Sequence, residues 1–123
     1  MPFEWAQFLD IAKFLLDHGR QVSILQDAAY RSAMSRAYYA AFGHAKMFAT
    51  DTLNFIPLGN EEDHILLRDF FKDNQRPEVS RHLSQLRQWR NQSDYDNPCY
   101  IINESQTRRA IQQAENLIHS MNA

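Results

Sequence analysis

The side chains best suited to chemistry lie in two polar segments of the chain. In the first, residues 31–45, polar residues recur every three or four positions among alanines, which makes them neighbours on one face of a helix. Arg36 and Tyr39 form one such pair, and Ser35 lies beside them. One interpretation is a buried layer of hydrogen bonds between helices, because a buried Tyr hydroxyl usually finds a partner. The other is that Arg36 and Tyr39 reach a cleft and hold an anionic ligand.

The second polar segment, residues 86–96, carries Arg87, Arg90, Asn91 and Asp94 at the same helical spacings. Arg90 and Asp94 can pair along the helix, and this pairing would offset the cost of an Asp near a helix C-terminus. That interpretation is purely structural. In the functional alternative, Arg90 contacts a phosphate group while Asp94 orients Tyr95 or an Arg of a partner.

The sequence contains no recognisable pattern of metal ligands and no other known catalytic motif. The five His residues, at positions 18, 44, 64, 82 and 119, form no pair at spacing four, and Cys99 is the single Cys. No Gly-rich phosphate loop, nucleophile elbow or catalytic triad pattern occurs. The sequence therefore predicts no metal and no cofactor.

Length and charge limit the possible classes of protein. The 123 residues fit one domain, spanning 1–123, and the net charge of −2 gives no basic field over the whole chain. No apolar run approaches the ~20 residues of a membrane helix. A single Cys fits a reducing compartment, and the N-terminus is acidic where a signal peptide is basic. We expect a cytoplasmic protein without a membrane partner.

The apolar pattern predicts an all-α fold, because no segment alternates as a half-buried strand does. Helices are expected over residues 3–18, 22–49, 61–72 and 77–93, with loops at 50–60 and 94–102. The last helix is expected to be capped by Asn103, with Gln106 in capping-box position. The expected architecture is a four-helix bundle with one additional short helix.

Two of the three glycines have expected roles in this bundle. Gly19 follows the apolar pattern of the first helix and is expected to be its C′ residue. Gly43 lies inside the longest helical segment and is expected to mark a close contact with another helix.

Three stretches of the chain together resemble the HEPN superfamily. They are SRAYYAAF at 35–42, His64 followed by Phe70, and RNQSDYD at 90–96. The chain is most similar to a small stand-alone branch that carries S-R-A-Y-Y-A-x-F and a later R-x-x-A-D-Y-D. The similarity covers roughly residues 20–118, and its specificity comes from two motifs in the right order.

The resemblance implies a helical bundle that forms a homodimer with a shared cleft. HEPN proteins include metal-independent ribonucleases of toxin–antitoxin and defence systems, and others are partners of minimal nucleotidyltransferases. The active nucleases place a His four to six residues after the motif Arg. Here Arg90 matches that Arg, but Tyr95, Asp96 and Asn97 stand where the His belongs. His64 matches a recurrent His of the branch and could supply the missing imidazole.

Three hypotheses follow from the residues and the resemblance. The first is a ribonuclease or toxin-type protein in which Arg90 and Arg36 hold phosphate and Asp94 orients them. The second is a non-catalytic module that binds a nucleotide or a nucleotidyltransferase partner, and the third is a structural dimer. In the ribonuclease hypothesis, the ligand contact or the assistance to proton transfer comes from Tyr95, Tyr39 or His64. The further residues assigned to ligand binding are Ser35, Asn91 and Arg87.

The dimer interface is expected among apolar residues that are poorly placed for solvent. These residues are Trp5, Trp89, Tyr100, Ile101 and Ile102. The alternative for Ile101 and Ile102 is that they pack against the start of the last helix.

Overall fold

The protein is all-α in the parts of the chain that the computed structural model describes, residues 4–21, 26–95 and 102–122. Its helices are α1 (Gln7–Gln21), α2 (Gln26–Thr52), α3 (Asp63–Asp73), α4 (Pro77–Tyr95) and α5 (Glu104–Asn122). Over these residues the predicted bundle of four main helices with one additional short helix is confirmed. No helix in the same ranges has the length and apolar character needed to cross a bilayer.

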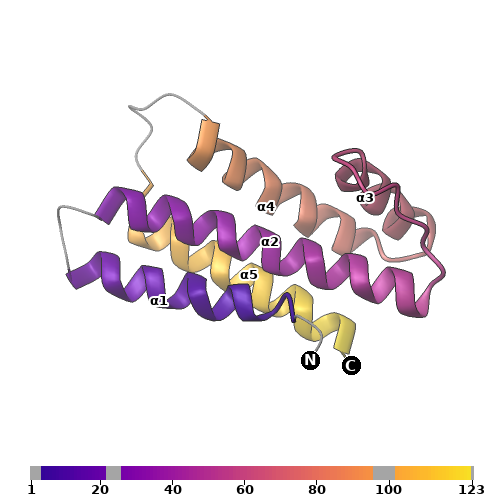
Figure 1. The fold of residues 1–123 in the computed structure, drawn as a ribbon, viewed down its shortest axis with the longest axis horizontal. Helices are drawn as coiled ribbons and strands as arrows, with labels where there is room; N and C mark the ends of the chain where they lie inside the picture. The colour runs from indigo at the N-terminus through magenta and orange to yellow at the C-terminus, as the bar shows by residue number, and fades with distance from the viewer. Residues whose placement is uncertain (1–3, 22–25, 96–101, 123) are drawn as a thin grey trace.

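The longest helix, α2, lies in the middle of the bundle and packs against α1, α4 and α5 (Figure 1). The short α3 packs mainly against α4, at the end of the bundle where α2 ends and α4 begins. A helix that is covered on several sides needs small or apolar residues around most of its circumference. In α2 the buried small residues are Ala29, Ala33, Ala37, Ala40, Ala41, Gly43, Ala45 and Ala49.

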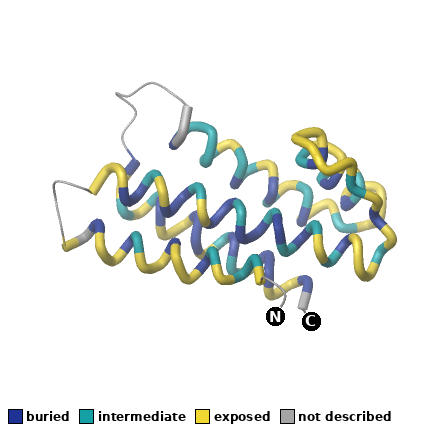
Figure 2. Tube along the Cα trace, viewed as in Figure 1, coloured by how far each residue is buried: buried dark blue, intermediate teal, exposed yellow. Residues whose placement is uncertain are grey.

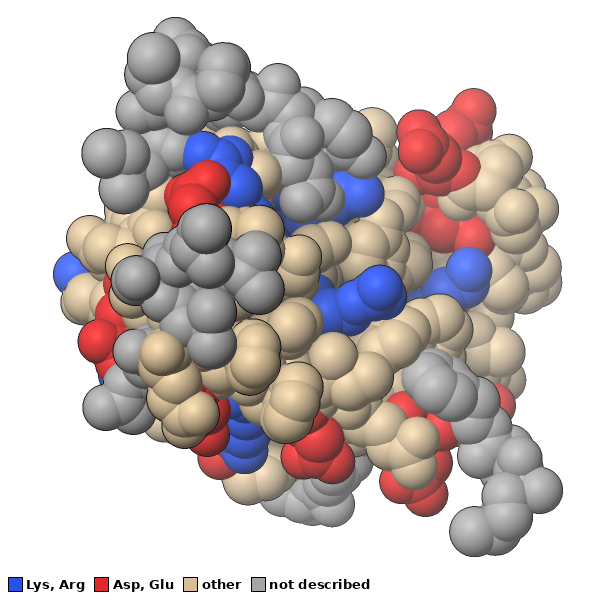
Figure 3. Space-filling model, turned by 60° about the vertical axis from the view of Figure 1, so that its left-hand side comes forward, with Lys and Arg blue, Asp and Glu red and all other residues tan. Residues whose placement is uncertain are grey.

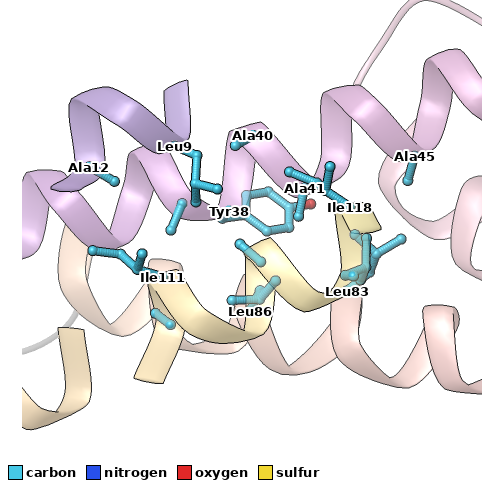
Figure 4. Packing of buried hydrophobic residues seen from close by; sticks show 14 of the residues in the cluster. Leu9, Ala12, Tyr38, Ala40, Ala41, Ala45, Leu83, Leu86, Ile111 and Ile118 are labelled. Atoms are coloured by element: carbon cyan, nitrogen blue, oxygen red, sulfur yellow. The ribbon is translucent and has the colours of Figure 1, made fainter. Parts of the chain in front are cut away.

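The hydrophobic core runs the length of the bundle between these helices (Figure 2). Its largest fully buried side chains are Tyr38, Leu67, Phe71, Leu83, Leu86 and Leu117. Figure 4 shows the ring of Tyr38 among the aliphatic side chains of the core. Each fully buried side chain of this size contributes about 1.5–3 kcal/mol to folding, so the core holds the polar residues near Tyr38 in place.

Most helix ends agree with the local sequence. Asn103 Oδ1 accepts a hydrogen bond from the Gln106 backbone N–H (2.8 Å), and Gln106 Oε1 accepts one from the Asn103 N–H (3.0 Å). The predicted capping box is therefore confirmed. Pro77 is the first residue of α4, as its missing N–H favours.

Several predicted boundaries are wrong. α1 begins at Gln7 instead of residue 3, and α2 continues to Thr52, so the predicted loop at 50–60 begins too early. Gly19 lies inside α1, which continues to Gln21, and a Cβ at Gly19 would lie 3.0 Å from the Cβ of Ala29. This glycine therefore permits the close approach of α1 to α2 instead of ending α1. The predicted loop at 94–102 begins too early, because α4 includes its first two residues, and residues 96–101 lie outside the described residues.

Candidate functional site

Arg90 and Tyr39 form the centre of the candidate site. Arg90 donates from Nη2 to the Tyr39 hydroxyl (2.7 Å) and from Nη1 to the Asn91 side-chain oxygen (3.1 Å). The Arg90 guanidinium also lies over the Tyr39 ring, 5.1 Å from its centroid. Because two separate nitrogens of the guanidinium donate hydrogen bonds, both its position and its plane are fixed.

His64 lies on the other side of Tyr39. Its ring stacks on Phe42 at a centroid distance of 4.1 Å and an interplanar angle of 20°, and it meets Tyr39 edge-to-face at 6.4 Å. His64 Nδ1 and the Tyr38 hydroxyl share a hydrogen bond. Tyr39 thus contacts both His64 and Arg90, which come from α3 and α4.

The charge state of His64 follows from this environment. Burial, followed by the nearby Arg87 and Arg90, lowers the pKa of His64 from 6.5 to about 4. Burial also raises the pKa of Tyr38 well above its usual value. Both side chains are therefore neutral at pH 7, and their hydrogen bond joins two uncharged groups.

A buried ion pair fixes the segment that carries His64. Asp63, 1% exposed, pairs with Lys46 Nζ of α2 (2.9 Å) and accepts hydrogen bonds from the backbone N–H groups of Leu58 (2.8 Å) and Gly59 (3.0 Å). Burial alone would raise the pKa of Asp63, but these donors outweigh it and lower the pKa. The connection before α3 is therefore tied to α2, which sets the position of His64.

The sequence interpretation missed Asp63 and Lys46 as parts of this arrangement. A Gly four residues before a carboxylate in the first turn of a helix was a usable signal, because Gly marks turns and Asp side chains often accept hydrogen bonds from turn N–H groups. The turn is present, and Gly59 has a φ of +82°. The partner on α2 gave no local signal, since Lys46 is seventeen positions away along the chain.

An open hollow of about 510 Å³ adjoins the Arg90 centre on the surface of α3 and α4. Its lining residues are Arg68, Ser84, Arg87, Gln88, Asn91 and Gln92. Arg87 and Asn91 were predicted site residues, whereas Arg68 and Ser84 were missed because α3 gave no sign of facing α4.

Figure 3 shows one face of the molecule in a space-filling view. Lys and Arg recur across the middle of this face, which is otherwise largely uncharged, and most of its Asp and Glu lie toward the edges.

The predicted residues Arg36 and Tyr39 have different neighbours. The Arg36 guanidinium lies 5.0 Å above the ring of Phe8, on the side of α1, and the side chain is exposed. Tyr39 contacts Arg90 of α4, so the two residues point toward different helices. Ser35 is half-buried.

Of the remaining residues of the two polar segments, Arg31 has a structural role, and the side chains of Asp94 and Tyr95 lie outside the described residues. Arg31, at the start of the polar segment 31–45, pairs with Asp27 (2.9 Å) and donates to the backbone oxygen of Ser93 (2.7 Å). These contacts support the structural interpretation for this end of the segment. Asp94 and Tyr95 belong to the last turn of α4.

The residues predicted for the dimer interface are less exposed than expected. Ile102 is buried in the core, so its assignment to an interface is wrong. Trp5 and Trp89 are half-buried, and Tyr100 and Ile101 lie outside the described residues. The large apolar residues that are exposed are Ile11, Phe14, Met47, Ile56, Leu58, Ile65 and Leu66.

The fold and the Arg90–Tyr39–His64 centre define a helical-bundle protein with a positively charged polar site. A model of the HEPN domain family matches residues 6–123, which is nearly the whole chain. The chain therefore belongs to the HEPN family, and the resemblance seen in its motifs is confirmed at the family level. No curated protein and no solved structure gives a significant match.

Proposed function

We propose that this protein binds RNA, with Arg90 holding a backbone phosphate. HEPN domains are generally ribonucleases or nucleotide-binding modules, so a phosphate-bearing ligand is the class that the family favours. The observation that supports this ligand here is the fixed guanidinium of Arg90. Its hydrogen bonds to the neutral oxygens of Tyr39 and Asn91 fix the direction of the guanidinium. An oriented guanidinium matches the geometry of phosphate oxygens.

The electrostatics of His64 support the same proposal. Arg87 and Arg90 both lower the pKa of His64, so their positive fields overlap at the imidazole. A neutral imidazole and the hydroxyl of Tyr39 can donate or accept hydrogen bonds beside a phosphate without repelling it. The site thus combines positive charge with uncharged polar groups, as an RNA backbone requires.

Metal-independent RNA cleavage is a second candidate function, favoured by the contact of both Arg90 and His64 with Tyr39. In such cleavage the ribose 2′-hydroxyl attacks phosphorus, so a base must accept its proton and an acid must protonate the leaving oxygen. His64 would take the role of the absent motif His. A pKa of about 4 makes it a weak base at pH 7, and we therefore rank cleavage below binding.

We also propose the biological setting that the family suggests. A homodimer would bring two Arg90 centres into a shared cleft, and the partner would be an antitoxin or a minimal nucleotidyltransferase of a toxin–antitoxin or defence system. The exposed Ile56, Leu58, Ile65 and Leu66 are the apolar residues available for such contacts near α3. Light scattering after size exclusion tests the dimer, and a monomer of 14.5 kDa alone would contradict it.

The decisive experiment compares wild type with Arg90→Gln and a matched control, Arg108→Gln. Arg108 is an exposed residue of α5 that pairs with Glu104 (2.8 Å), so its loss removes the same charge away from the site. We expect Arg90→Gln to weaken binding of a labelled oligouridylate about 10- to 100-fold, corresponding to one charge-assisted contact. Equal affinity in wild type and Arg90→Gln, with both folded, would refute the proposal.

Cleavage is tested on the same samples by incubating tRNA with each protein in EDTA. Cleavage by wild type and not by Arg90→Gln or His64→Asn would establish the second candidate. If Arg90→Gln changes thermal stability alone and binding is absent throughout, the bundle has a structural role.

A further inference from the structure

The hollow beside the Arg90 centre has an unusual composition. Its six lining residues include two Arg, three side-chain amides and one hydroxyl, and they include no carboxylate. Every one of these side chains can donate a hydrogen bond, and two carry a positive charge. Donors and positive charge without acidic residues are the chemistry that binds phosphate.

The two Arg residues of the hollow are not neutralised within the described parts of the chain. Arg68 donates from Nη1 to the hydroxyl of Ser84 at 3.4 Å, a long bond to an uncharged group. Arg87 Nε is buried and meets no acceptor among the described residues. Arg31 and Arg108, by contrast, pair with carboxylates at 2.9 and 2.8 Å. The hollow therefore keeps two positive charges that no carboxylate of the described residues pairs with, unlike the charges of Arg31 and Arg108.

The hollow is continuous with the Arg90 centre through Asn91. Asn91 lines the hollow, and its side-chain oxygen accepts the hydrogen bond from Arg90 Nη1. On α4, positions 84, 87 and 91 are three and four residues apart and share one face. Arg68 reaches the same place from α3. A ligand held at Arg90 can thus extend along α4 into the hollow.

We infer that the Arg68–Arg87 hollow is a second phosphate subsite, which binds the phosphate next to the one held at Arg90. This inference rests on the proposed function and makes it more specific. The ligand must carry two linked phosphate groups, which an RNA strand and a nucleoside diphosphate both provide. The open shape of the hollow and its continuity with the Arg90 centre favour the RNA strand, because a strand continues beyond the second phosphate.

The test measures how salt affects the binding of a labelled heptauridylate. For single-stranded nucleic acid the slope of log K against log salt is negative, and its magnitude falls by about 0.7 for each phosphate contact that is lost. We expect Arg68→Gln and Arg87→Gln each to weaken binding about tenfold and to reduce this slope by about 0.7. Arg108→Gln should leave both unchanged, and Arg87→Lys should restore the slope because it restores the charge.

The outcomes separate the subsite from the function on which it rests. If Arg90→Gln weakens binding while Arg68→Gln and Arg87→Gln leave affinity and slope unchanged, the second subsite is refuted and RNA binding stands. If Arg90→Gln has no effect, the proposed function itself fails. Circular dichroism and thermal unfolding confirm that each variant is folded. If Arg87→Gln does not fold, Arg68→Gln and Arg87→Lys decide the result.

Competition distinguishes the two sources of linked phosphates. Displacement of the heptauridylate by ADP but not by AMP, at concentrations comparable with the oligonucleotide, would assign the two subsites to a nucleoside diphosphate. Displacement only by a longer unlabelled oligouridylate would assign them to an RNA strand. Equal displacement by AMP and ADP would show that one phosphate suffices and would overturn the second subsite.

Discussion

Arg90 and Tyr39, fifty-one positions apart in the chain, are joined by a hydrogen bond of 2.7 Å from the guanidinium to the phenol hydroxyl. The same guanidinium also lies over the phenol ring. Tyr39 therefore supports Arg90 in two ways that mutation can separate. The hydroxyl fixes the direction of the guanidinium, and the ring provides a surface that attracts its charge.

Tyr39→Phe removes the hydroxyl and keeps the ring. We expect it to lower the free energy of unfolding by about 1.5 kcal/mol, the lower part of the range for hydrogen bonds to charged groups, because Tyr39 is half-buried. We also expect weaker RNA binding with an unchanged salt slope, since the charge of Arg90 remains. Urea unfolding and fluorescence anisotropy measure the two effects. A changed salt slope would show that Tyr39 does more than orient Arg90.

The protonation of His64 gives a prediction on pH. The pKa of His64 is about 4 in the folded protein, whereas the unfolded chain has the ordinary value of 6.5. Between pH 4 and pH 6.5 the unfolded chain therefore binds a proton that the folded chain does not. Stability contributed by neutral His64 is therefore complete above pH 6.5 and is lost as the pH falls toward 4. We expect a loss on the order of 2 kcal/mol over this range, since one pKa unit corresponds to about 1.4 kcal/mol and the site is partly open to solvent.

NMR titration of the His64 ring measures this pKa directly, and His64→Asn identifies the resonance by its disappearance. A midpoint near 6.5 in the folded protein would contradict the prediction. The same variant should flatten the stability profile between pH 6.5 and 4. His18→Asn, at an exposed position of α1, serves as the control for removing an imidazole.

Asp63 gives a separate prediction at lower pH. Replacing it with Asn leaves Lys46 without its buried partner, and we expect a loss of about 3 kcal/mol at pH 7. The pKa of Asp63 is lowered in the folded state, so its stabilisation is complete above the ordinary value of 3.8 and declines as the pH falls below it. The difference in unfolding free energy between wild type and Asp63→Asn should therefore shrink below pH 3.8. A constant difference down to pH 2 would indicate that Asp63 acts as a hydrogen-bond acceptor without a charge contribution.

The fold was predictable from local patterns, whereas the site was predictable only in part. The helices follow from apolar spacing, and the cap at Asn103 follows from its partner three residues away. Tyr39, Arg90 and Asn91 were identified because their polar groups stand at helical spacings, Tyr39 in the middle of α2 and the other two near the end of α4. The contact between Tyr39 and Arg90 could not be derived, because the angle at which α4 crosses α2 is set by packing over both helices.

Arg36 and Asp63 show why the remainder was missed. Arg36 stands three residues before Tyr39, and spacing alone assigned both to one cleft, but its guanidinium lies over Phe8 of α1. A helix residue at the border between two neighbours can turn to either, and the choice depends on the tertiary structure. Asp63 looked like an ordinary first-turn acid, because its partner Lys46 becomes visible only when the loop before α3 folds back on α2.

Gly43 presents a case in which the type of contact was predicted and the partner was not. A close approach was expected from another helix, but a Cβ at this position would collide with the indole of Trp5, which precedes α1. Trp5 also meets Phe8 edge-to-face at 5.6 Å, so the indole has other packing that opposes its displacement. The glycine thus permits the N-terminal segment to pack directly on α2.

Gly43→Ala should lower the free energy of unfolding by about 1–3 kcal/mol through overpacking, although Ala is favoured over Gly within a helix by about 1 kcal/mol. The two contributions separate in the Trp5→Ala background, where the space for the added methyl group is open. There, Gly43→Ala should stabilise the protein by about 1 kcal/mol. The sign of the effect therefore reverses between the two backgrounds, and urea unfolding of the four proteins in this cycle measures the coupling. If Gly43→Ala stabilises both backgrounds equally, Trp5 does not occupy the face of α2 at Gly43.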